Sequence, residues 1–210
     1  MSSESLPLSS YLKDQTAMLH LQVEQHPWVI QLLNGRLSIS NYGLLLYLLL
    51  EVYETFESNL SYGSKHVLYR EELLRTEKIK QDLKILSDLI DFNSLKNSIL
   101  VNPYAIYLKN ETQLETWVGH FYTRYFGDIQ GGQIIKRNLK INYNLPEEAL
   151  TFYDFSAFKK RYPEGIHYLR AMINEIPFST QQKTSVLSES KKSFLLSSQL
   201  MDLCLSYGTS

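Results

Sequence analysis

The chain has 210 residues, with 21 basic and 22 acidic side chains, a formal net charge of -1 and a single cysteine. The near-neutral charge excludes the broad positive field that drives non-specific nucleic-acid binding. One cysteine, Cys204, excludes an internal disulfide and a cysteine-rich zinc site. The longest apolar run, Leu44–Leu50, is too short to cross a bilayer, and residues 1–10 lack a secretory pattern. We therefore expect a soluble, cytoplasmic protein without a transmembrane anchor or a nucleic-acid partner.

Helical periodicity runs through almost every segment, and no alternating strand pattern occurs. We expect an all-α fold, a single multi-helix bundle over residues 1–210 in which residues 1–9 form a flexible N-terminus. The expected helices begin or end at proline, glycine or capping residues: from Ser9 or Ser10 to before His26-Pro27, from Pro27 to Asn34-Gly35, from Ser38 or Ser40 to about Asn59, Tyr69–Leu86, a short helix opening at Pro103, Glu111–Leu139, and Ser156–Asn174 divided at Pro163-Glu-Gly165.

The last helix shows the clearest pattern. Leu187, Phe194 and Met201 recur every seven residues, with Leu195 and Leu205 beside them. This spacing predicts one apolar stripe that packs against the rest of the bundle.

One segment, His120–Gln133, carries glycines where the pattern otherwise predicts a helix. Each glycine in a helix interior costs about 1 kcal/mol relative to alanine, so Gly127, Gly131 and Gly132 need a reason. At 100° per residue they share a face with Asp128. Such a face lets a flat ligand lie against the main chain beside one acid. The alternative is that the glycines let another helix pack closely.

A second pattern lies on the first helix, where His20 and Glu24 are four residues apart and therefore share a face. A histidine that binds a metal commonly gives its other N–H to a nearby carboxylate. Taken alone, the pair is also compatible with a solvated surface pair. Of the other histidines, His26 is expected to mark a helix boundary and His120 to be structural, at the margin of a cleft.

The two patterns together, Leu19-His20-Leu-Gln-Val-Glu24 and Tyr122-Thr-Arg-Tyr-Phe-Gly-Asp-Ile-Gln-Gly-Gly-Gln133, resemble the heme oxygenase family. The likeness extends from about Leu12 to Met201. It implies a bundle in which heme b is sandwiched between the first helix and a kinked, glycine-rich distal helix. No flavin or nicotinamide fingerprint occurs, so the electrons are expected from a separate reductase or ferredoxin.

The resemblance also implies roles for individual residues. His20 corresponds to the proximal iron ligand, with Glu24 restraining its other ring nitrogen. Gly127 and Gly131 correspond to the glycines over the heme face, and Asp128 to the distal acid that organises ordered water. Other residues are expected to bind the heme or its propionates: Lys13, Tyr122, Gly132, Arg170 and Phe194. The sequence departs from the family one turn before Arg170, where Ile166 and His167 stand and a second basic residue is expected.

The activity implied is the cleavage of heme to biliverdin, carbon monoxide and ferrous iron, with dioxygen as co-substrate and heme as both substrate and cofactor. Two alternatives remain. The first is a non-catalytic heme-binding or delivery protein of the same fold, and Asp128 with its glycines argues against it. The second is a helical protein of another kind, in which the glycines serve packing alone.

Overall fold

The structure is a computed structural model that describes residues 6–60, 63–90 and 101–207, and all regular structure in these ranges is helical. The absence of strands within them confirms the all-α prediction. The α-helices are α1 (Leu8–Glu24), α2 (Pro27–Leu33), α3 (Ile39–Leu60), α4 (Thr76–Leu86), α6 (Pro103–Lys109), α7 (Leu114–Gln130), α8 (Gly132–Tyr143), α9 (Ser156–Arg161), α10 (Ile166–Asn174) and α11 (Thr180–Tyr207). Short 3-10 helices join them: η2 (Gly63–Leu68), η3 (Glu71–Leu73), η4 (Glu147–Ala149) and η5 (Thr151–Tyr153).

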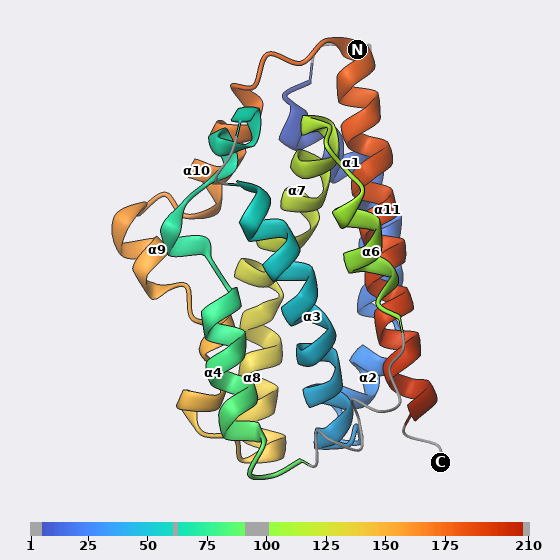
Figure 1. The fold of residues 1–210 in the computed structure, drawn as a ribbon, viewed down its shortest axis with the longest axis vertical. Coiled ribbons are helices and arrows are strands. Elements are labelled where there is room, and N and C mark those ends of the chain that lie inside the picture. Colours follow the sequence, from blue (N-terminus) through green and yellow to red (C-terminus); the bar gives the residue numbers. More distant parts are fainter. Residues whose placement is uncertain (1–5, 61–62, 91–100, 208–210) are drawn as a thin grey trace.

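The longest described helix, α11, spans one side of the elongated bundle, at the right of Figure 1. It packs along α7 and also against α1, α2, α3 and α6. The short helix α10 likewise contacts both α1 and α7. Together α10 and α11 hold α1 and α7, which carry the two sequence patterns, in one part of the fold. None of the described helices is both long and apolar enough to cross a membrane.

The first helix begins earlier than the sequence indicated. It starts at Leu8, after Pro7 in an extended conformation, rather than at Ser9 or Ser10. Leu8 and Ser9 are buried, and the Ser9 N–H donates to the Asn174 side chain of α10 at 2.8 Å. The expected flexible N-terminus therefore cannot reach residue 9, because a contact with α10 fixes the first turn. Residues 1–5 lie outside the described residues.

The predicted starts at Pro27 and Pro103 are confirmed. Each proline occupies the first turn, where its missing N–H costs no hydrogen bond. The side chain of the preceding residue caps each helix: His26 Nδ1 accepts from the Trp28 N–H, and Asn102 Oδ1 accepts from the Ala105 N–H. His26 is thus the boundary residue that the sequence predicted.

The expected helix over Tyr69–Leu86 is wrong before Thr76, where the regular helix α4 starts. The physical reason is Arg75, whose side chain is fully buried. Its guanidinium donates to the carbonyl oxygens of Leu73 and Glu72 and, across the fold, to those of Phe152 and Asp154. These bonds hold the chain before α4 in an irregular conformation, because those carbonyls must point at one cation.

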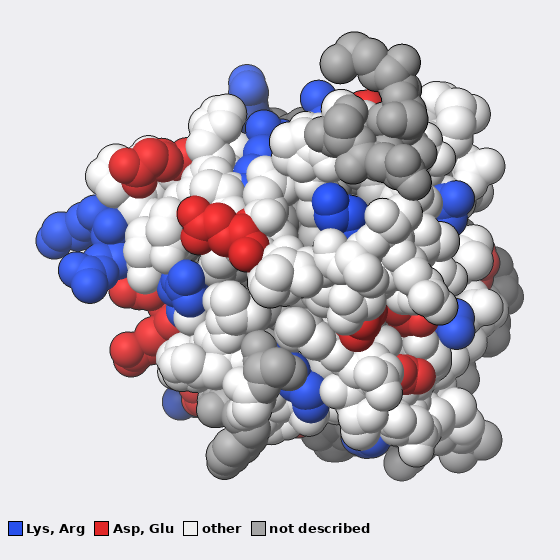
Figure 2. Space-filling model, turned by 90° about the horizontal axis from the view of Figure 1, so that it is seen from above, with Lys and Arg blue, Asp and Glu red and all other residues white. Residues whose placement is uncertain are grey.

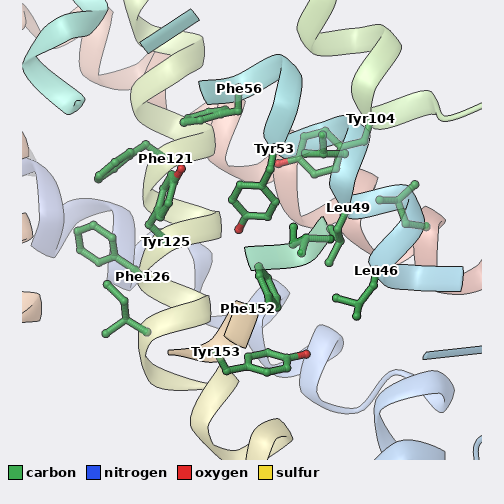
Figure 3. Packing of buried hydrophobic residues seen from close by; sticks show 14 of the residues in the cluster. Leu46, Leu49, Tyr53, Phe56, Tyr104, Phe121, Tyr125, Phe126, Phe152 and Tyr153 are labelled. Atoms are coloured by element: carbon green, nitrogen blue, oxygen red, sulfur yellow. The ribbon is translucent and has the colours of Figure 1, made fainter. Parts of the chain in front are cut away.

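The centre of the fold is an aromatic and leucine core around α3. Figure 3 shows Tyr53 of α3 reaching toward α7, between Tyr125 and Phe152. The Tyr53 ring meets both neighbours edge to face, with centroids 5.7 Å apart in each pair. Edge-to-face packing of this kind adds stability beyond the buried area and fixes ring orientation. The Tyr53 hydroxyl is therefore aimed rather than free to turn.

The apolar stripe of α11 is confirmed at Leu187, Phe194 and Met201, which are all buried. Leu195 was wrongly assigned to it, because its side chain is 55% exposed. One residue after Phe194 the helix has turned by 100°, which carries Leu195 to the outer face. The division of Ser156–Asn174 is confirmed as well: α9 and α10 are separate helices.

Candidate functional site

The glycine-bearing segment forms two helices that meet at Gly131. This residue keeps helical dihedrals, with φ at -67° and ψ at -34°, and its N–H donates to the Gly127 carbonyl at 2.7 Å. The expected single helix, Glu111–Leu139, is wrong at both ends. Gln113, in an extended conformation, precedes α7, and Asn144 ends α8 with a left-handed φ of 52°. The kink itself lies where the glycines predicted it.

The glycines of this segment face different surroundings. A Cβ atom added at Gly127 would meet no atom within 4 Å, so this residue borders open space. At Gly131 the nearest atom, 3.2 Å away, is the Gly127 carbonyl oxygen of the same helix. At Gly132 a Cβ would lie 2.8 Å from the Tyr153 ring. Both interpretations of the glycines therefore apply, but to different residues: Gly127 and Gly131 leave a bare helix surface, while Gly132 admits a neighbouring aromatic ring.

Asp128 lies buried between α3 and α7. The Tyr53 hydroxyl donates a hydrogen bond to Oδ2, and Arg124 Nη2, one turn earlier on α7, lies 3.2 Å from Oδ1. Arg124 also reaches α11, where its Nη1 is 3.5 Å from the Ser197 hydroxyl. Tyr53 could not be predicted from the sequence, because a tyrosine in a leucine-rich helix has the pattern of an ordinary core residue. Its distance from Asp128 in the chain gave no signal either.

Burial raises the pKa of the Asp128 carboxyl above its ordinary value, and the neighbouring Arg124 cation and Tyr53 hydroxyl oppose this only in part. Burial also raises the pKa of Tyr53 well above 10, which keeps its phenol protonated. A carboxyl group with a raised pKa takes up and releases a proton at a pH closer to neutral. Asp128 is therefore suited to exchanging protons with a molecule held against the open side of α7, while the protonated Tyr53 holds its carboxyl group in place.

His20 lies on α1 with its ring 56% exposed. Nδ1 is 3.5 Å from the Glu24 carboxylate, as the spacing predicted, and the Phe194 ring of α11 meets the imidazole edge to face with centroids 6.2 Å apart. Among the described residues no group hydrogen-bonds to Nε2. His20 is thus oriented from two sides while one ring nitrogen stays available, which is the arrangement of a metal-ligating histidine before its metal is added.

A group of basic and phenolic residues lies where α1, α7 and α10 meet. Burial raises the pKa of the half-buried Tyr122, which the Thr16 hydroxyl of α1 and the Arg170 cation of α10 oppose. Lys13 is exposed on α1, three residues before Thr16. Neither Lys13 nor Arg170 has an acidic partner among the described residues. These cations can therefore bind an anionic group without first losing an ion pair. His167, on the turn before Arg170, is exposed.

The other histidine near the glycine-rich face, His120, has no access to the open side of α7. Its ring is fully buried, and Nδ1 lies 2.9 Å from the Tyr104 hydroxyl. This position agrees with the structural role expected from the sequence and leaves His20 as the exposed candidate ligand.

The donor set of this site fits heme better than a free metal ion. No cluster of three or more metal-ligating side chains occurs in the part of the chain that the structure describes. A lone imidazole can still bind iron whose other in-plane ligands come from a macrocycle. The open surface at Gly127 suits a flat ring, and the cations Lys13 and Arg170 suit carboxylates at its edge. Fold and donor set together fit the class of all-helical heme-binding proteins.

Comparison with known proteins agrees with a heme-binding fold. The family model described as heme oxygenase matches residues 6–202. The heme oxygenase of Pyropia yezoensis is 31% identical over 202 residues, covering 93% of this chain and 84% of that protein. The structure of heme oxygenase from Leptospira interrogans is 28% identical with a TM-score of 0.79, covering 94% of this chain and 100% of the other. The crystal structure of heme oxygenase-1 from Synechocystis sp. PCC6803 in complex with heme shares the fold, with a TM-score of 0.80 at 24% identity over 96% of this chain and 94% of the other. The chain belongs to the heme oxygenase family.

Proposed function

We propose that this protein cleaves heme to biliverdin, carbon monoxide and ferrous iron, and that His20 and Asp128 do the main work on opposite sides of the ring. Heme supplies the redox-active iron and is also the molecule that is cleaved, with dioxygen and external electrons as co-substrates. The observation that carries the proposal is the pairing of one oriented, partly unbonded imidazole with a bare helix surface next to a buried acid.

Each residue of the chain has a defined task in this proposal. Glu24 and Phe194 orient the His20 ring, so that Nε2 is the nitrogen that binds iron. Gly127 and Gly131 keep side chains out of the space above the ring, and Gly132 holds the kink closed against Tyr153. This leaves room on the distal side for a second molecule.

Asp128 holds and delivers protons through solvent on the distal side. Its Oδ2 accepts the Tyr53 hydrogen bond and its Oδ1 faces Arg124, so the carboxyl cannot rotate freely. Because burial raises its pKa, the group holds a proton more readily than an exposed aspartate and can exchange it with ordered water. In this proposal, proton supply at a fixed place favours cleavage of the heme ring over other reactions with dioxygen.

Lys13, Tyr122 and Arg170 bind the propionates in this proposal. On α10 only Arg170 is assigned to this task, since Ile166 or His167 stands where a second basic residue is expected. Fewer anchors leave the rotation of the ring to apolar contacts, so the biliverdin isomer depends on packing as much as on charge.

We also propose a cytoplasmic enzyme that receives electrons from a separate reductase or ferredoxin. The only cysteine, Cys204, is buried and free, which suits a reducing compartment. Figure 2 shows acidic and basic side chains interspersed on one end of the molecule, with a basic group at the left, on the side where Figure 1 places α9. The exposed Lys159, Lys160 and Arg161 of α9 offer positive charge to an acidic donor protein.

Aerobic incubation of the hemin complex with ascorbate or a ferredoxin system, followed by chromatography of the products, tests the proposal. The unchanged protein should form biliverdin. His20→Ala should lose both turnover and the iron–histidine spectrum, while the exposed His167→Ala serves as a control and should keep both. An iron–histidine spectrum that survives in His20→Ala would place the ligand elsewhere.

Asp128→Ala should lower the biliverdin yield by about a hundredfold, the usual size of a lost general acid. Hemin binding should persist, since iron ligation stays on α1. A variant yield equal to that of the unchanged protein would remove Asp128 from the mechanism. Hemin that binds without any biliverdin in the unchanged protein would support the non-catalytic alternative instead.

A further inference from the structure

A second buried polar cluster joins α6, α7 and α11, away from Asp128. His120 of α7 lies with Nδ1 2.9 Å from the Tyr104 hydroxyl and Nε2 3.4 Å from the Glu189 carboxylate. The Tyr104 hydroxyl is 2.6 Å from that of Ser193, and the Tyr107 hydroxyl donates to Glu189 at 2.6 Å. The cluster thus connects two points of α11, one turn apart, to the two helices beside it.

The hydrogen bonds of this cluster have a defined direction. A carboxylate only accepts, so the proton of a neutral His120 belongs on Nε2, which faces Glu189. Nδ1 then accepts from the Tyr104 hydroxyl, and the Tyr104 oxygen accepts from Ser193. Burial lowers the pKa of His120, which keeps the ring neutral. The arrangement of protons that fits the Glu189 carboxylate therefore has Ser193 donating to Tyr104 and Tyr104 donating to His120, with the His120 Nε2–H facing Glu189 at 3.4 Å.

The same stretch of α11 carries contacts to both walls of the candidate heme site. Phe194, the residue after Ser193, meets the His20 ring of α1 edge to face. Ser197, one turn after Ser193, lies 3.5 Å from Arg124, the partner of Asp128. Any rotation or shift of α11 at Glu189 and Ser193 is thus transmitted to the residue that backs the proximal imidazole.

Gly119, the residue before His120, packs so closely against α11 that the two helices cannot move nearer to each other. A Cβ at Gly119 would lie 2.7 Å from the Glu189 Cβ and 2.8 Å from the Ser190 nitrogen. The Ser190 hydroxyl lies 3.3 Å from the Gly119 carbonyl oxygen and donates to it. The two helices are therefore in direct backbone contact here, and the cluster fixes their rotation about that contact.

We propose that His120 and Glu189 form a positioning pair for the proposed reaction: through Tyr104 and Ser193 they fix the turn of α11 that holds Phe194 against the His20 imidazole. The expected effect of this pair on turnover rests on the proposed function. The pair touches neither heme nor dioxygen. Its effect is on the orientation of the iron ligand.

The main test is Glu189→Ala, compared with Glu189→Gln and Glu115→Ala. Glu115 makes a similar α7–α11 contact, accepting from Gln182 at 2.8 Å, two turns nearer the start of α11 and away from Phe194. Glu189→Ala should shift the iron–histidine stretching band of the ferrous heme complex and lower kcat about tenfold, the usual cost of losing a group that orients a metal ligand. Glu189→Gln should restore most of both, and Glu115→Ala should change neither.

A milder variant and a measurement on the heme-free protein distinguish the proposed effect from simple unfolding of Glu189→Ala. Tyr104→Phe removes one hydroxyl and should shift the band in the same direction, by less. In the protein without heme, nuclear Overhauser contacts between the His20 and Phe194 rings should weaken in Glu189→Ala and persist in Glu115→Ala.

An unchanged iron–histidine band together with unchanged ring contacts in Glu189→Ala would overturn the proposal. A band shift of equal size in Glu115→Ala would do the same, because the effect would then be general loosening of α11. The proposed function fails separately, if the unchanged protein forms no biliverdin or if His20→Ala keeps the iron–histidine band. The contacts in the heme-free protein can be read in either case.

Discussion

The two halves of α7 use the same residue type for opposite purposes. At Gly119 the missing side chain lets α11 approach so closely that a Cβ would lie 2.8 Å from the Val186 carbonyl oxygen. At Gly127, two turns later, nothing lies within 4 Å of that position. A glycine in a helix therefore indicates a close approach in one place and an opening in another. Only the surroundings decide between them.

The buried polar side chains of α7 also differ between its two halves. In the first half, His120 is enclosed by α6 and α11 and its neighbours are all protein groups. In the second half, Asp128 is held by Tyr53 and Arg124 next to the open surface. The first half fixes where the helix lies, and the second half presents groups to a ligand. Changes in the first half should therefore act on helix position and stability, and on the ligand only through α11, whereas changes in the second half should act on the ligand directly.

The largest effect on stability is expected from Gly119→Ala. The added Cβ would lie 2.7–2.8 Å from atoms of α11, two of them backbone atoms that cannot turn aside. We expect a loss of about 1–3 kcal/mol in the free energy of unfolding, the typical cost of overpacking. Urea denaturation of the heme-free protein measures it. A midpoint equal to that of the unchanged protein would mean that the helices can separate cheaply.

Gly127→Ala should act in the opposite sense. In the heme-free protein the new methyl group meets no atom within 4 Å and improves helix propensity, so stability should rise by up to about 1 kcal/mol. The same methyl group projects into the space that we assign to heme, so hemin affinity and turnover should fall, by about tenfold or more. Denaturation and hemin titration together test this. Higher stability with undiminished hemin binding would show that the open surface faces something else.

A smaller, pH-dependent effect is expected from His120. Burial lowers its pKa below the ordinary 6.5, with the carboxylates of Glu189 and Glu111 opposing and the Lys192 cation reinforcing the shift. The unfolded chain then binds the proton more readily, so stability is complete above about pH 6.5 and is lost as the pH falls toward the lower folded value. In His120→Gln this loss should be absent from unfolding curves measured between pH 7 and 5. Parallel curves for the two proteins would contradict the buried, neutral ring.

Asp128 is expected to make stability depend on pH in the opposite direction. Because burial raises its pKa above the ordinary 3.8, the folded state binds the proton more readily than the unfolded chain. Its contribution is complete below about pH 3.8 and is lost as the pH rises through the folded value. Asp128→Asn should remove this decline in the heme-free protein. We expect this effect to be the smallest, since Arg124 and Tyr53 offset part of the pKa shift that burial causes. If stability in Asp128→Asn falls with pH as before, another group causes the decline.

The sequence was sufficient for the parts of the fold that depend on local rules. Pro27 and Pro103 start helices because proline suits the first turn, and the Pro163 interruption divides α9 from α10. The seven-residue spacing of Leu187, Phe194 and Met201 identified the buried face of α11. The four-residue spacing of His20 and Glu24 correctly placed their side chains together.

The sequence could not supply the parts that depend on contacts between distant segments. Arg75 lies in a charged, amphipathic stretch whose pattern is typical of a solvent-facing helix, and its burial depends in part on the distant carbonyls of Phe152 and Asp154. Tyr53 and Glu189 have no local signal for their bonds to Asp128 and His120. The different roles of Gly127 and Gly132 depend on Tyr153, which lies beyond the next helix.

Arg75 also has a consequence for how the chain folds. Its cation is satisfied only when the carbonyls of Leu73 and Phe152, 79 residues apart in the sequence, have come together. A nascent chain that ends before η4 lacks the Phe152 and Asp154 carbonyls that bind this charge, and α4 then has its contacts with α3 but not those with η4 and η5. We therefore expect the middle of the protein to acquire its structure in one cooperative step, late in synthesis. A fragment truncated after α8 should behave as a loose collection of helices.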